Sequence, residues 1–344
     1  KNTFSFYNIF RDKATSDHAK NQQKIHHSIK TDNEFYAFFS KLNFKTEIHS
    51  QFYNIEKKKI DSEDFTGTYG RVFPMTGFYF ETPLIDKKNN FRIKPKASFV
   101  INGSQTSTNK VSNEESTNNG YSLLNNSALN RFTGTDKLDN TKRVNYGLDL
   151  SKDLFKFEIA QSYEIDANST YNKEVGLKDY MSDLLGASSY SGEHNILSHS
   201  FRLNVDQGKI ASQNFNYSNS SNIGTFTLGY NEEKKEVNTI LEKGTKNLSV
   251  GFGSSIFSDF SSINTNLSYD LVTDDPKTFN FGYQYLDECF GVNLDWGRTF
   301  FEDRDLKPTD TVTILFSFKD LGGYQSTNLA VSEKDKQNIR WSTR

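Results

Sequence analysis

The feature that most restricts the fold is a period-two alternation of apolar and polar residues, repeated in segment after segment of the second half of the chain. Successive side chains of a strand point to opposite faces, so this alternation predicts strands with one apolar face. No helical period competes there. The clearest segment sets Phe279, Phe281, Tyr283 and Tyr285 against Asn280, Gly282 and Gln284.

The same pattern recurs often enough to predict a meander of antiparallel strands. Polar stretches such as Lys87–Asn90 and Asp274–Lys277 have the composition of hairpin turns. Counting the segments gives about fourteen to sixteen strands of roughly ten residues, the length that a tilted transmembrane strand requires. Further apolar faces are Val144, Tyr146, Leu148 and Leu150; Phe226, Leu228 and Tyr230; Leu248, Val250 and Phe252; Phe290, Val292, Leu294 and Trp296.

The composition favours a membrane barrel over a soluble fold. Only 34% of the residues are hydrophobic, yet the chain contains 30 Phe and 17 Tyr. It has no run of about 18 apolar residues, so a transmembrane helix is excluded and a barrel is the remaining way to span a membrane. Small and polar residues opposite the aromatic face fit a hydrated lumen. A soluble β-sandwich remains an alternative because its strands alternate in the same way.

Several other classes of function find no support in the sequence. The net charge of -2 gives no basic footprint for nucleic acid. Neither the paired carboxylates nor the histidine pairs His26–His27 and His194–His199 are framed by a catalytic or zinc motif. We therefore expect no enzyme activity, no catalytic residues, no metal site and no cofactor.

One connection differs from the short turns. Residues 102–141 are rich in Asn, Ser, Thr and Glu and lack periodicity. A connection of about 40 residues is too long for a compact domain unless it has a function. We expect a barrel portion over residues 1–323 with 102–141 as a long extracellular loop, and a polar tail over residues 324–344.

Residues in this connection carry a resemblance to a known family, the lipopolysaccharide-assembly proteins LptD. The stretches Asn113–Ser116 and Leu123–Asn126 precede a block similar to the family's Asn-Arg-Phe-x-Gly-x-Asp run and its Arg-x-x-Tyr-Gly strand start. Two further blocks, Arg71–Pro74 with Pro83-Leu84 and Asp287–Cys289, follow the family's order. The family-like loop motif comprises Asn130, Arg131, Phe132, Gly134, Asp136, Arg143, Tyr146 and Gly147.

The resemblance implies an integral protein of the outer membrane of Gram-negative bacteria. Its members receive lipopolysaccharide (LPS) from a periplasmic LPS bridge and release it sideways between barrel strands into the outer leaflet. A plug lipoprotein of the LPS translocon is the implied partner. A general outer-membrane porin or a structural barrel is the alternative, although a porin's inward-folded loop carries opposed charge clusters that residues 102–141 lack.

The chain departs from the family pattern in three ways. The family's amino-terminal jellyroll is absent, its barrel is larger, and some members have two adjacent cysteines where this chain has Cys289 alone. We therefore expect the carboxyl-terminal portion of a larger barrel, with the first strands near Glu34–Phe44 at an open edge. The resemblance also implies that Cys289 forms an interdomain disulfide, which the oxidising periplasm allows.

The segment Thr311–Phe318 resembles the terminal-strand signal read by the barrel-assembly machinery. That signal starts with a polar residue, continues with alternating apolar residues and ends aromatic-x-aromatic. The residues that match it are Thr311, Phe316 and Phe318, while Thr313 stands where Gly is usual. An ordinary amphipathic strand is the other interpretation of the same pattern.

Overall fold

The computed structural model shows an all-β chain that divides into two compact units. Unit 1 comprises residues 1–187 and 202–210, and unit 2 comprises residues 188–201 and 211–344. In the part of the chain that the structure describes, no helix is long and apolar enough to span a membrane. The structure describes residues 1–15, 18–60, 63–103, 108–117, 120–167, 176–177, 180–237, 240–258, 260–300, 307–318, 322–325 and 329–331.

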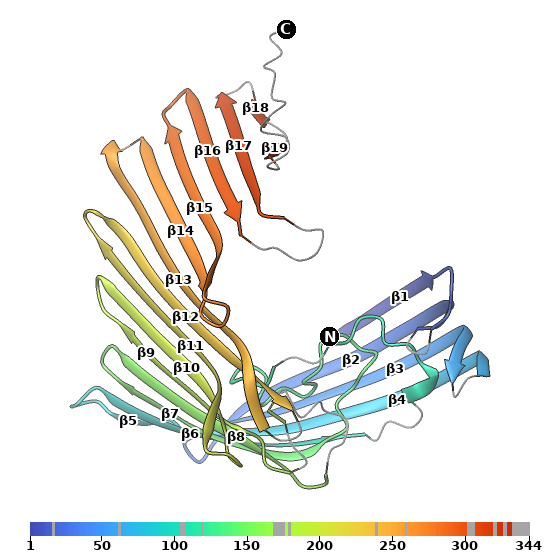
Figure 1. Cartoon of the computed structure of the whole chain (residues 1–344). Coiled ribbons are helices and arrows are strands. Elements are labelled where there is room, and N and C mark those ends of the chain that lie inside the picture. The colour runs from blue at the N-terminus through green and yellow to red at the C-terminus, as the bar shows by residue number, and fades with distance from the viewer. Residues whose placement is uncertain are drawn as a thin grey trace. The chain divides into compact units, whose positions relative to one another are not determined.

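Unit 1 is built on an antiparallel meander in which each strand pairs with the next, except that β4 and β5 both pair with β6 (Figure 1). Pro83 lies between the end of β4 and the start of β5, where its missing N–H cannot donate to a neighbouring strand. After this break, β5 continues the pairing with β6 that β4 began. The strands are β1 (Asn2–Phe10), β2 (Asn21–Ala37), β3 (Ser40–Ile60), β4 (Glu63–Glu81), β5 (Leu84–Asp86), β6 (Phe91–Asn102), β7 (Lys142–Lys152) and β8 (Phe155–Glu164).

Unit 2 is a second antiparallel meander. Its strands are β11 (Lys209–Ser221), β12 (Gly224–Val237), β13 (Ile240–Ser258), β14 (Ser261–Asp270), β15 (Asp275–Leu286), β16 (Phe290–Thr299), β17 (Thr309–Phe318), β18 (Gly322–Gln325) and β19 (Leu329–Val331). Strand β11 begins in unit 1, and β9 (Leu184–Ser191) and β10 (Asn195–Asn204) each lie partly in both units.

The register of unit 2 places the aromatic residues of successive strands on one face. Phe281 lies between Thr265 of β14 and Trp296 of β16, and Tyr283 lies between Ile263 and Leu294. Among the unit 2 side chains that the structure describes, Ala211 is the one buried hydrophobic residue. The aromatic face is therefore not packed into a two-sheet core, which excludes the β-sandwich alternative and confirms the predicted barrel wall.

The two faces of unit 1 also differ in chemistry. One face exposes large apolar side chains, including Phe44, Ile48, Phe52, Phe78 and Phe99. The other face carries charged and amide side chains, and we call it the polar face of unit 1. Its residues include Lys24, Gln51, Arg71 and Arg143, which the strand register brings to the same side. Figure 1 shows the connection between β6 and β7 running across β1–β4.

Two predictions about the strands require correction. Strands β2, β3 and β4 span 17, 21 and 19 residues, well beyond the predicted length. Residues 34–44 form the β2–β3 hairpin, in which β3 pairs with both β2 and β4, while β1 pairs only with Asn21–Ile29, so Glu34–Ala37 pair on one side alone within the described part of the chain. Residues Gly322–Gln325 and Leu329–Val331 form short strands on β17, so the predicted polar tail contains paired strand, and residues 332–344 lie outside the described part.

Candidate functional site

The β6–β7 connection lies packed on the polar face of unit 1. We call its residues 108–141 the docked segment; residues 118–119 within it lie outside the described part. It begins with the short 3-10 helix Thr108–Lys110 and returns to the sheet where Asn102 N donates to Thr141 O at 2.9 Å. The sequence predicted a long functional loop here but gave no sign that it packs against the strands.

Three apolar clusters anchor the docked segment. Leu129 and Leu138 pack on Phe73, Met75 and Val100 of β4 and β6. Burying a leucine side chain stabilises by roughly 1.5–3 kcal/mol, so these contacts are substantial. The other two clusters join Val111 to Ala19, Tyr53 and Ile55, and join Tyr121 and Phe132 to Leu177 and Leu185.

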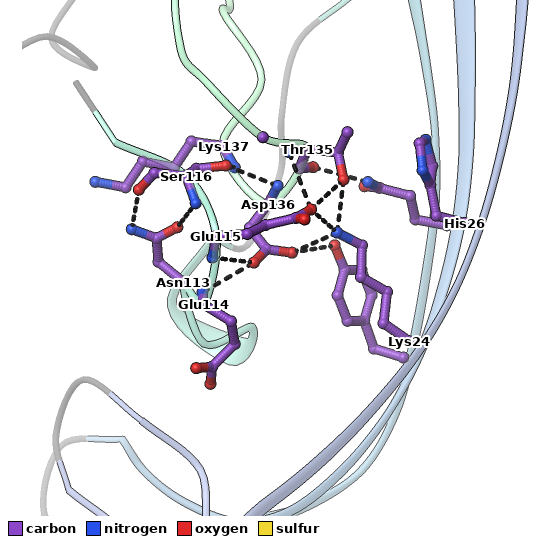
Figure 2. A network of polar contacts seen from close by, with 12 residues as sticks. Lys24, His26, Asn113, Glu114, Glu115, Ser116, Thr135, Asp136 and Lys137 are labelled. Carbon is purple, nitrogen blue, oxygen red and sulfur yellow. Dashed lines mark hydrogen bonds and ion pairs between the residues drawn. The ribbon is translucent and has the colours of Figure 1, made fainter. Parts of the chain in front are cut away.

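Lys24 is the centre of a buried polar network between β2 and the docked segment (Figure 2). Its Nζ donates to Glu115 Oε1 at 2.5 Å, to Thr135 Oγ1 at 2.6 Å and to Asp136 Oδ1 at 2.8 Å. The Lys24 side chain is 4% exposed and that of Asp136 is 2% exposed. Removing one partner of such a buried pair leaves an uncompensated charge, which costs about 3–5 kcal/mol.

Arg71 of β4 holds the same turn of the docked segment from a neighbouring strand. Its Nη2 donates to the backbone oxygens of Thr135 at 2.8 Å and Asp136 at 2.7 Å. Gln51 Nε2 donates to Thr135 O at 2.7 Å, and Tyr53 OH donates to Asp136 Oδ1 at 3.2 Å. Three strands thus converge on two consecutive residues.

The acidic-Ser stretch is folded back on this turn. Asp136 Oδ2 accepts from the backbone nitrogens of Glu114 at 2.9 Å and Glu115 at 3.2 Å. In return Ser116 Oγ accepts from the backbone nitrogens of Asp136 and Lys137, both at 2.9 Å. Figure 2 shows the two stretches facing each other through these reciprocal bonds.

The carboxyl group of Glu115 is held in its ionised form. Partial burial opposes ionisation, but the hydrogen bonds from Lys24 and Thr135 outweigh it and lower the pKa of Glu115 below its ordinary value. Elsewhere in the docked segment, burial raises the pKa of Tyr121 to about 12, so its hydroxyl remains protonated and donates to Asn126 Oδ1 at 2.6 Å.

Two arginines fix the carboxyl-terminal half of the docked segment. Arg131 lies in the segment and donates to Ser162 Oγ at 2.7 Å and Glu164 Oε1 at 3.3 Å, both on β8. Arg143 of β7 donates to Asp139 Oδ2 at 2.9 Å, and both side chains are fully buried. Arg143 also donates to the backbone oxygen of Ala128.

Most of the family-like residues predicted from the sequence meet at this assembly. Asn130 Oδ1 accepts from Phe132 N at 3.3 Å and Asp139 N at 3.1 Å, which closes the turn that carries the motif. Gly134 has a φ of +71°, where a side chain is strained. Tyr146 and Gly147 are exceptions. Tyr146 lies on the apolar face and donates to Gln161 Oε1 at 2.7 Å. Gly147 lies close against Ile159 and Ala160 of β8, where a Cβ would be 2.7 Å from Ile159 O.

The remaining predicted residues lie in unit 2. Cys289 is exposed and free, and it is the chain's single cysteine. Its backbone nitrogen donates to Asp287 Oδ1 at 2.8 Å in the turn between β15 and β16, and this bond with that of Phe290 lowers the pKa of Asp287. The assembly-signal residues Thr311, Thr313, Phe316 and Phe318 all lie on β17.

Sequence analysis missed the strand residues that receive the docked segment. These strand residues, Lys24, Gln51 and Tyr53, belong to no recognised motif. The one available signal was that they occupy positions of paired strands that point to the same face of the sheet. It also missed the cross-strand pair His26 and His49, whose Nε2 and Nδ1 lie 3.0 Å apart. Among the described residues, no group of three potential metal ligands was found.

A single-layered antiparallel meander with an uncovered apolar face and a polar face that carries an anchored loop defines the class: a transmembrane β-barrel protein. The family described as "LptD: LPS transport system D" matches residues 1–274. The chain therefore belongs to the LptD family, whose members are non-enzymatic barrels that transport LPS at the outer membrane. It is an integral outer-membrane protein with LPS as its substrate.

The other comparisons add little. A mutant of the Rh. blastica porin is 11% identical over 94% of this chain and 98% of its own, with a TM-score of 0.34. A mutant of the Pseudomonas aeruginosa ferric enterobactin receptor is 9% identical over 87% of this chain and 55% of its own, with a TM-score of 0.43. No curated protein matches the chain.

Proposed function

We propose that the chain forms part of the wall of an LPS translocon and that the polar face of unit 1, with the docked segment on it, lines the route of the saccharide portion into the outer leaflet. The observation that carries this proposal is the anchoring of the docked segment by Lys24, Arg71, Arg131 and Arg143. A segment held by so many buried polar contacts is a fixed part of the lining.

The two faces suit the two halves of such a substrate. Hydrated sugars require hydrogen-bonding groups along their path, which the polar face supplies. The apolar face meets lipid, where every backbone polar group must be satisfied within the sheet. Release sideways between strands brings the acyl chains directly into the leaflet.

The asymmetry of the connections supports an orientation. In unit 1 the turns at Phe38-Phe39, Lys87–Asn90 and Asp153-Leu154 are short, whereas the docked segment connects strands at the opposite end. Outer-membrane barrels have short periplasmic turns and long extracellular loops. The docked segment therefore starts from the extracellular end, and the short turns face the periplasmic LPS bridge.

The partners of this translocon are a plug lipoprotein, the periplasmic LPS bridge and the barrel-assembly machinery. An exposed Cys289 with no second cysteine in the chain suits a disulfide to an amino-terminal domain of the complete protein. A Cys289→Ser variant tests this pairing on non-reducing gels. A gel mobility equal to that of the parent protein would show that Cys289 is not bridged.

The test of the lining role uses a strain whose only copy of the gene carries Lys24→Met with Asp136→Asn. Both buried charges are then removed together, and we expect a loosened docked segment and reduced surface LPS. The matched control is Lys30→Met, on the same strand and face, whose Nζ pairs at 2.8 Å with Glu47 outside the docked segment. Normal surface LPS in the double variant, with its docked segment shown to be loosened by hydrogen exchange, would contradict the proposal.

A porin is the competing function, and it makes a different prediction for the same strain. Loosening a constriction loop changes the conductance for small solutes and leaves LPS at the cell surface unchanged. Family membership favours LPS transport, because the match covers most of the chain.

A further inference from the structure

A hollow lies on the polar face of unit 1, apart from the Lys24 network. It has a volume of about 240 Å³ and opens between β3, β4, β6, β7 and β8 on one side and the docked segment on the other. Its polar lining includes Asn43, Ser98, Asn126, Ser127 and Asn145.

The amide and hydroxyl groups of the hollow offer both donors and acceptors. Asn43 Nδ2 donates to Asp32 Oδ1 at 2.7 Å, while its buried Oδ1 has no hydrogen-bond partner within the described part of the chain. Asn126 Oδ1 accepts from Tyr121 OH, so its amide nitrogen is the atom that can serve a ligand. A buried acceptor without a partner is costly. A rotation of the Asn43 side chain that exposes Oδ1 to the hollow would let a ligand hydroxyl satisfy it.

The charges around the hollow are balanced. Lys96 Nζ lies 2.5 Å from both Asp149 Oδ1 and Glu158 Oε1. Lys41 Nζ lies 2.6 Å from Glu34 Oε2, and Lys45 Nζ lies 3.6 Å from Asp32 Oδ2. Each lysine of the lining therefore has a carboxylate partner. A paired ammonium group gives little net attraction to an anion, whereas the mixture of ammonium, carboxylate and amide groups can bind a ring of hydroxyls.

The size of the hollow limits its ligand. Pockets for drug-sized ligands have volumes of about 300–1,000 Å³, so this one accommodates about one ring. We propose that the hollow is a subsite for an uncharged sugar ring of the LPS saccharide. This inference rests on the proposed function, because it assigns a ligand to a position on the same polar face.

The experiment measures binding of lipid-free LPS core saccharide to the complete protein in detergent by saturation-transfer NMR and calorimetry. Asn43→Leu removes the orphan acceptor and Ser127→Trp fills the exposed rim of the hollow. We expect each to weaken binding about tenfold, the equivalent of roughly 1.4 kcal/mol. The control Asn54→Leu, on the opposite face of β3, should leave the affinity unchanged.

Folding is checked separately, by the hydrogen-exchange protection of β3 and β4. Unchanged saccharide affinity in folded Asn43→Leu and Ser127→Trp would overturn the subsite. Displacement of the saccharide by inorganic phosphate would also overturn it, because it would show an anion site. Failure of the proposed function gives a different result. If the protein exports LPS in cells but does not bind free saccharide, only the subsite is contradicted. If cells that lack the protein still have normal surface LPS, the export function itself is contradicted.

Discussion

At Gly134 the family-like motif has a direct conformational reason. A Cβ on Gly134 would lie 2.6 Å from the backbone oxygen of Glu115, in addition to the strain of its positive φ. We expect Gly134→Ala to destabilise the docked segment by at least about 1–2 kcal/mol, the cost of a left-handed conformation for an L-residue. Hydrogen exchange of residues 113–116 measures the change. Gly120→Ala is the control, since nothing lies within 4 Å of its Cβ position, and equal protection in both variants would contradict the expectation.

Glu115 predicts how the docked segment responds to acid. Its folded pKa is lowered, so its stabilising contribution is complete above the unfolded pKa of about 4.3 and is lost as the pH falls through the folded pKa. After correction for intrinsic exchange, we expect constant amide protection at residues 114–116 near neutral pH and a decrease below about pH 4. In Glu115→Gln, we expect the decrease in amide protection below about pH 4 to be much smaller. If the dependence of amide protection on pH is unchanged in that variant, the acid response belongs to another group.

Sequence alone could identify the motif residues but not their receptors. Asn130, Gly134 and Asp136 were recognisable because they form a short contiguous run. Lys24 lies 112 positions before Asp136, and its role depends on which face of β2 it occupies. That face follows from the register of several strands, and a shift of one residue would point Lys24 to the opposite side.

At the scale of elements, β15 gives the cleanest test of the two faces. Phe281 lies on the apolar face and its neighbour Asn280 on the other. Phe281→Lys should destabilise the barrel by about 2–4 kcal/mol if it lies near the bilayer midplane, whereas Asn280→Lys should have little effect. Urea-induced unfolding in lipid vesicles measures both. A larger loss for Asn280→Lys would reverse the assignment of lipid and lumen.

Strand β17 carries the proposed assembly signal. The ring centroids of Phe318 and Phe290 lie 5.3 Å apart, and Phe318 remains nearly half exposed. In a strain whose only copy carries Phe318→Asp, we expect depleted barrel in the outer membrane and reduced surface LPS, because a charge is placed on the lipid face. The matched control is Ser317→Asp on the adjacent, opposite-facing position. Normal abundance and export of Phe318→Asp would remove the signal assignment.

The sequence predicted the strands most accurately where only one face of the strand is apolar. In β15 the alternation is clean, and the strand was recognised from its aromatics. In β3 the inner side chains Tyr53 and Ile55 are also apolar, because the docked segment covers them. With apolar residues on both faces the period-two signal weakens, so sequence analysis underestimated the length of β3. Short strands such as β18 are too brief to show any period.

At the scale of the whole molecule, membership of the LptD family and the two-faced meanders lead to one account. The apolar faces belong in lipid, and we propose that the polar face of unit 1, with the docked segment fixed on it, belongs to the route of a hydrated substrate. No chemistry is required of the chain itself, since the family transports LPS without enzymatic activity.

The most direct test of LPS transport follows newly made LPS in cells. Expression of the complete protein is switched off, LPS is pulse-labelled, and the labelled LPS at the cell surface is compared with that retained in the inner membrane. The account predicts that labelled LPS accumulates in the inner membrane and that restoring the gene returns it to the surface. Undiminished arrival of labelled LPS at the surface after depletion would contradict it.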